Sequence, residues 1–121
     1  MFGWLFGPCR KASPAALQNR LNSDLAAYVH TFGMPERLRE HLESQGRSGE
    51  LASVQSKLDQ VLADTSDFLY AQRDPIRWGS EFEQELFLYL SARHGWLTRD
   101  GFGPIRSFAA WLTWHEGLSA P

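Results

Sequence analysis

The sequence predicts an all-α fold: a single-domain bundle of about five helices, over roughly residues 14–32, 35–45, 49–72, 81–94 and 104–116. Apolar residues recur at the spacing of a buried helix face, and alternating strand patterns are absent. Proline, serine and glycine bound these segments at positions where helices start and stop. The 121 residues predict one domain, 1–121, long enough to bury a core without metal or disulfide bonds.

The first two helices are defined by their ends. Ser13 and Pro14 are typical of an N-cap and a first helical residue, and a glycine follows the last apolar position. One arc of the first helix carries Leu17, Leu21, Leu25, Tyr28 and Phe32. Pro35 begins the second helix, whose apolar content is only Leu38 and Leu42, so we expect it at the surface.

The third helix has the clearest pattern. Its apolar positions alternate in steps of three and four residues, which makes a heptad seam of Leu51, Val54, Leu58, Val61, Thr65 and Phe68. Such a seam packs inside a bundle or pairs with another copy of the chain. We favour the bundle, and a homo-oligomer formed through this heptad stays open. Pro75 sets the end of the segment, because the residue before a proline is biased away from helical geometry.

The fourth helix carries a capping-box pattern, in which Ser80 precedes Glu83 by three residues. Apolar residues surround most of its circumference: Phe82, Leu86, Phe87, Leu88, Tyr89 and Leu90. A helix that is apolar on most sides is typical of the centre of a bundle. We therefore expect this helix to be the central one, ending at His94 and Gly95.

The fifth helix is predicted to begin at Pro104 and to end before Gly117. Its core-facing stripe consists of Ile105, Phe108, Ala109 and Leu112. Trp111 and Trp114 lie outside that stripe at about 100° per residue. Either the chain termini cover these two indoles, or they form an exposed apolar patch.

The N-terminal residues 1–12 form an apolar arm rather than part of the bundle. No basic residue precedes their short apolar run, so we expect neither a signal peptide nor a membrane span. We favour an arm that packs on the helices through Phe2, Trp4, Leu5 and Phe6; an exposed hook for a membrane or a protein is the alternative. A single cysteine, Cys9, favours a reducing compartment, and we expect the protein to be cytoplasmic.

Composition and motifs argue against several functions. The net charge of −2 is unlike that of a general nucleic-acid binder. The four histidines have no metal-ligand spacing, and neither a nucleophile motif nor a phosphate-binding glycine loop is present. We therefore predict no catalytic residue, no metal and no cofactor. Whether the chain is an enzyme stays open, with a non-catalytic protein favoured.

Two places suit an anion or a small ligand. Arg93 falls on the apolar face of the fourth helix, where its guanidinium either extends past the helix end or faces a pocket. The stretch 94–106 contains Trp96, Arg99 and Arg106 beside glycines and the predicted start of the fifth helix, whose free N–H groups attract anions. A plain corner between two helices explains the same residues and is the favoured interpretation.

The favoured function is a small non-catalytic binding domain with an acidic and aromatic surface. Its predicted contact residues are Asp64, Asp67, Asp74, Glu81, Trp78, Trp111 and Trp114. Acidic residues would steer a protein partner of basic character, and tryptophans would anchor it. The character is that of an adaptor or inhibitor, and in general character it resembles the immunity proteins of bacterial toxin systems, although no motif carries that resemblance.

Two other functions stay open. The first is a helical small-ligand binder or minor enzyme, with an aromatic pocket between the fourth and fifth helices near Arg93, Trp96 and Arg106. An enclosed aromatic cavity would favour it, and a filled core would count against it. The second is a self-associating structural protein, which uses the heptad seam or the N-terminal arm.

Overall fold

The computed structural model describes residues 14–30 and 34–120. It contains five α-helices, as the sequence predicts, and a short 3₁₀ helix: α1 (Pro14–His30), α2 (Pro35–Ser44), η1 (Ser48–Glu50), α3 (Leu51–Tyr70), α4 (Ser80–Arg93) and α5 (Arg99–His115). The predicted all-α bundle is therefore confirmed. The N-terminal arm, the N-cap at residue 13 and the predicted end of the first helix at residue 32 lie outside the described residues.

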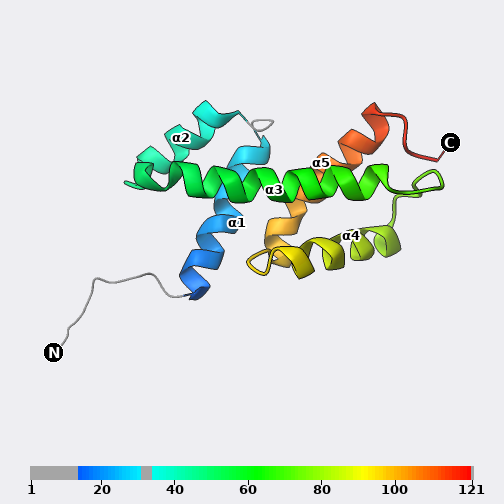
Figure 1. Ribbon diagram of the computed structural model, residues 1–121, viewed down its shortest axis with the longest axis horizontal. Helices are drawn as coiled ribbons and strands as arrows, with labels where there is room; N and C mark the ends of the chain where they lie inside the picture. The colour runs from blue at the N-terminus through cyan, green and yellow to red at the C-terminus, as the bar shows by residue number, and fades with distance from the viewer. Residues whose placement is uncertain (1–13, 31–33, 121) are drawn as a thin grey trace.

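The central helix is α3, and the prediction that the fourth helix is central was wrong. Figure 1 shows α3 along the longest dimension of the molecule, crossed by α1 and α5, with α2 near one end and α4 below the other. The predicted seam of α3 faces this core, where Val54, Leu58, Val61 and Thr65 are buried. The seam is thus used within one chain, which leaves it unavailable to a second copy.

Helix α4 is peripheral although its sequence is apolar on most sides. Only Leu86 and Leu90 are fully buried on it. Its aromatic residues lie half-buried at the edge of the bundle, where rings of Phe82 and Tyr89 pack on Phe68 with centroids 5.7 and 4.9 Å away. The predicted capping box does not form, because Gly79 is the N-cap and Ser80 is already helical.

The start of α5 differs most from expectation, since the helix begins at Arg99 and not at Pro104. Thr98 is the N-cap, and its hydroxyl accepts a hydrogen bond from the Gly101 N–H at 3.2 Å. Pro104 therefore lies inside the helix, where it removes one backbone hydrogen bond to the carbonyl of Asp100. Asp100 is exposed, so water can satisfy that carbonyl.

A buried amide on α1 holds the connection between α4 and α5. The Asn22 side chain donates to the carbonyl of Trp96 at 2.9 Å and accepts from the Thr98 N–H at 3.2 Å. Gly101 allows this close approach, because a Cβ atom there would overlap the Asn22 Oδ1 atom. Asn22 thus explains why a helix with two early glycines starts where it does.

The C-terminal residues close the other end of the bundle. Gly117, at φ +71°, ends α5, as predicted. The chain then pairs with the connection between α3 and α4 through Ile76, whose N–H donates to Leu118 at 2.8 Å and whose carbonyl accepts from Ala120 at 2.8 Å. This is an isolated bridge, and the described residues contain no β-strand.

Candidate functional site

The corner at residues 94–106 is not built as an anion site. The N–H groups near Ile105 and Arg106, which were expected to be free, lie inside α5. The guanidinium of Arg99 donates to Gln84 at 2.6 Å and lies over the Phe87 ring at 4.2 Å. Arg106 pairs with Glu83 at 3.5 Å. The expected free N–H groups are therefore internal to the helix, and both arginines contact α4.

The other predicted ligand residues do not converge either. Arg93 is exposed and its guanidinium lies over the Tyr89 ring on its own helix, 4.6 Å from the centroid. The Trp96 ring packs edge-on against His94, with centroids 6.2 Å apart. These two side chains belong to separate contacts, so they form no common pocket with Arg99 and Arg106.

The space between α4 and α5 is packed. Phe87 and Phe102 meet edge to face with centroids 5.3 Å apart. What remains is an open recess with a mixed polar and apolar lining, formed by Ser80, Glu83, Gln84, Arg99, Phe102, Gly103 and Arg106. The aromatic pocket that a helical small-ligand binder needs is not found between these two helices.

The predicted acidic residues have different environments. Asp64 accepts a hydrogen bond from His94 at 2.7 Å and is part of the scaffold. Asp67 is exposed on α3, while Asp74 and Glu81 line a cleft beside α4. Glu85, Arg73 and Arg77 also line this cleft, so two guanidinium groups accompany its three carboxylates and its charge is mixed. The predicted acidic surface is therefore divided.

The predicted tryptophans also separate. Trp78 is half-buried and packs on Phe82 with centroids 5.3 Å apart. Trp111 and Trp114 are 44% and 72% exposed on α5, and the N-terminal arm that was expected to cover them lies outside the described residues. They lie about 160° and about 140° around the helix from the buried Ala109, at about 100° per residue. The cleft that holds Asp74 and Glu81 contains neither of them.

The most buried charge among the described residues, Asp24 on α1, was not predicted from the sequence. Its carboxylate is fully buried and accepts two hydrogen bonds from Arg47, at 3.0 and 2.8 Å. His41 lies 3.1 Å from the same carboxylate. The available signal was the position of Asp24 within the apolar arc of the first helix, between Leu21 and Tyr28. The network satisfies a buried charge, and it joins α1 to α2 and to the loop before η1.

The pair of His94 and Asp64 has the residue types of a catalytic dyad but lacks its third member. The imidazole is almost fully buried at the end of α4 and contacts the carboxylate through Nε2. Within residues 14–30 and 34–120, no hydroxyl or thiol group hydrogen-bonds to this histidine. The pair therefore ties α3 to the end of α4 without a nucleophile.

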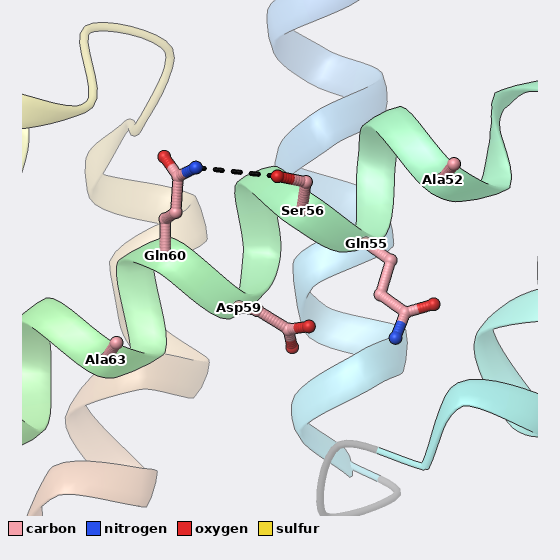
Figure 2. A pocket seen from close by; sticks show the side chains of 6 residues that line it. All are labelled: Ala52, Gln55, Ser56, Asp59, Gln60 and Ala63. Carbon is pink, nitrogen blue, oxygen red and sulfur yellow. Dashed lines mark hydrogen bonds between the residues drawn. The ribbon is translucent and has the colours of Figure 1, made fainter.

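The outer face of α3 carries a shallow depression. Figure 2 shows its six lining residues, all on this helix: Ala52, Gln55, Ser56, Asp59, Gln60 and Ala63. Gln60 donates to Ser56 at 3.4 Å, and Asp59 accepts a hydrogen bond from the Tyr28 hydroxyl of α1 at 2.7 Å. The depression is open and its acid is already engaged, so it presents no convergent chemistry.

A groove with an apolar lining runs between α1 and α5. It is lined by Val29, His30, Pro104, Ser107, Phe108 and Trp111. The Trp111 ring stacks on His115 with centroids 4.7 Å apart and an interplanar angle of 21°. Trp114 lies one turn further along α5. This groove and the neighbouring Trp114 are the candidate functional surface, because no Asp, Glu, Lys or Arg is among their residues.

Other kinds of site receive no support. Among the residues that the structure describes, no group of three or more His, Cys, Asp or Glu side chains could hold a metal ion. No helix in that part of the chain has the length and apolar composition needed to cross a bilayer. In comparisons with known proteins, no family model, curated protein or solved structure matches the chain.

Proposed function

We propose that this protein is a small helical binding domain and that Trp114 anchors its protein partner. The observation that carries the proposal is the 72% exposure of this indole on a well-packed helix. Burial of an aromatic side chain of this size is among the strongest contributions to a protein interface. An exposed tryptophan on a rigid helix needs little ordering when a partner covers it.

The partner that fits is a protein with an apolar recess and an uncharged centre. The outward-facing residues of the second half of α5 are Ser107, Trp111, Trp114 and His115, which include no Asp, Glu, Lys or Arg. Just past the helix end, the Glu116 carboxylate lies 3.0 Å from the His115 ring. Exclusion of charge from the centre is typical of protein interfaces. The basic partner expected from the acidic stretch 64–85 would contact only the rim, because those carboxylates belong to α3, α4 and their connection.

Site-specific photo-crosslinking in the host cell tests this proposal. A benzophenone amino acid replaces Trp114, and in the matched control it replaces Leu88, which is 53% exposed on α4. We expect one discrete adduct with a different protein from position 114 and none from position 88. Equal capture at both positions, no capture, or an adduct only with a second copy of this chain would each overturn the proposal.

The captured partner then allows a quantitative test. Trp114→Ala should weaken its binding at least about 30-fold, which corresponds to about 2 kcal/mol for a residue at the centre of an interface. Leu88→Ala should change binding less than about fivefold, since peripheral contacts contribute little. Equal effects of the two substitutions would show that Trp114 is not the anchor.

A further inference from the structure

A second recess lies between α1 and α5, closer to the start of both helices than the apolar groove. That recess is lined by Asn19, Asn22, Ser23, Thr98, Asp100 and Gly101. We call the line of contact between α1 and α5 the α1–α5 seam. Near the start of the two helices this seam is polar and carries one carboxylate, Asp100. Near the end of α1 it is apolar, and no Asp, Glu, Lys or Arg lines it. Asp100 is exposed and forms no ion pair with the described residues.

The residues that precede α1 carry charges and apolar side chains that would complement the two recesses. The basic residues lie next to the helix and the apolar residues lie further from it along the chain. Arg10 and Lys11 come just before the helix, and the apolar residues Phe2, Trp4, Leu5 and Phe6 come earlier, in a stretch without charge. A segment that turns back at Pro14 and runs antiparallel to α1 would therefore meet the polar recess first and the apolar groove afterwards.

The length of this segment matches the seam. From Pro14, an extended chain advances about 3.3 Å per residue while α1 advances about 1.5 Å per residue. Arg10, four residues before Pro14, reaches about 13 Å, which is the length of about nine helical residues and the level of Ser23 in the polar recess. Phe6 reaches about 26 Å, which is the level of the end of α1 beside the apolar groove.

The face of α1 along which this segment would run is exposed. Asn19, Ser23 and His30 lie within about 40° of one another around the helix, at about 100° per residue. All three are exposed, and two of them have short side chains. Helix α2 packs on a different face of α1. The contacts of His41 on α2 and of Arg47 after it are made to Asp24, which lies about 100° around α1 from Ser23.

We propose that residues 6–11 bind along the seam between α1 and α5 of the same chain, with Arg10 and Lys11 beside Asp100 and with Phe6 in the groove lined by Val29, Phe108 and Trp111. This contact is independent of the proposed function, since Trp114 lies outside the seam. It covers the groove, so that Trp114 is the part of the candidate functional surface that stays exposed to a partner.

The single cysteine allows a direct test in the full-length chain. A nitroxide spin label on Cys9 broadens the NMR signals of nearby amides. In the proposed register, Cys9 lies close to the level of Leu25 and Ala26, so we expect signal loss at Ser23, Ala26 and Ser107. The signals of Arg39 and Glu43 on α2 and of Leu88 on α4 should keep their intensity.

Variants separate the proposed register from other contacts. Phe6→Ser should restore the lost signals of the labelled chain, and Asp100→Lys should weaken the contact. Glu81→Lys is the matched control, because it makes the same charge change on α4 and should leave the pattern unchanged. The proposal is wrong if the groove signals stay intact, if the loss grows with protein concentration, or if it appears only with lipid vesicles. None of these results depends on a partner, so they leave the role of Trp114 to its own test.

Discussion

At the scale of single residues, the hydrogen bond between Tyr28 and Asp59 predicts a loss of stability at alkaline pH. Burial first, and then the bond to Asp59, raise the pKa of Tyr28 from 10.0 to about 12 in the folded state. The unfolded chain therefore loses this proton first. The stabilising contribution is complete below about pH 10 and is lost as the pH rises through about 12.

Urea unfolding at several alkaline pH values measures this effect. The free energy of unfolding of the natural chain should fall more steeply between about pH 10 and 12 than that of Tyr28→Phe, which cannot titrate at this position. The phenylalanine variant is the control for all other groups that titrate in the same range. Parallel profiles of the two proteins would contradict the prediction.

Two glycines on the first turns of α5 should respond to substitution by alanine with opposite changes in stability. Gly101→Ala should destabilise the protein by about 1–3 kcal/mol, because its methyl group would displace the Asn22 amide from its buried hydrogen bonds. Gly103→Ala meets no atom within 4 Å, so it should stabilise the helix by about 0.5–1 kcal/mol. Thermal unfolding of both variants decides this, and destabilisation by both would argue against Asn22 as the cause.

Also at this scale, the hydrogen-bond partner of each buried polar residue could not be predicted from the sequence. The position of Trp111 and Trp114 outside the core-facing stripe followed from their angles around a helix, which depend only on local periodicity. The partners of Asn22 and Asp24 lie 74 and 23 residues further along the chain, at Trp96 and Arg47. No local pattern encodes such a pairing, so these buried groups were missed.

At the scale of elements, all five helices were predictable, and the start of α5 was the largest error. The sequence offers Pro104 as a helix start, because proline is typical of a first helical position. The structure instead uses Thr98 as the cap, and the contact of Asn22 with Gly101 holds the first turn against α1. Tertiary packing thus extends α5 through two glycines, and this removes the free N–H groups on which the predicted anion corner depended.

The junction of α1 with α2 and η1 depends on a buried ion pair. Arg47→Met should cost about 3–5 kcal/mol, since it leaves the Asp24 carboxylate buried with only His41 beside it. Asp24→Asn in the same chain removes the uncompensated charge and should recover more than about 1 kcal/mol of that loss. Chemical denaturation of the single and double variants measures this coupling, and strictly additive losses would contradict it.

At the scale of the whole molecule, the separation of acidic and aromatic residues could not be predicted. Both groups are recognisable in the sequence, but their relative placement depends on how α3, α4 and α5 cross. The cleft beside α4 combines Asp74, Glu81 and Glu85 with two arginines, whereas no Asp, Glu, Lys or Arg lines the groove at α5. One predicted surface therefore becomes two, and the proposed function rests on the aromatic one.

The position of α3 predicts that the bundle unfolds as one unit. This helix contacts α2 near its beginning and α4 near its end, and its buried side chains belong to one continuous core (Figure 1). Leu58→Ala, at a fully buried position in the middle of α3, should cost about 2–5 kcal/mol. Native-state hydrogen exchange should show the same loss of protection in α2 and in α4, although neither helix is altered. Leu88→Ala, at an exposed position, should change protection by less than about 0.5 kcal/mol. A loss confined to one end would show that the two ends of α3 unfold separately, each with its own part of the core.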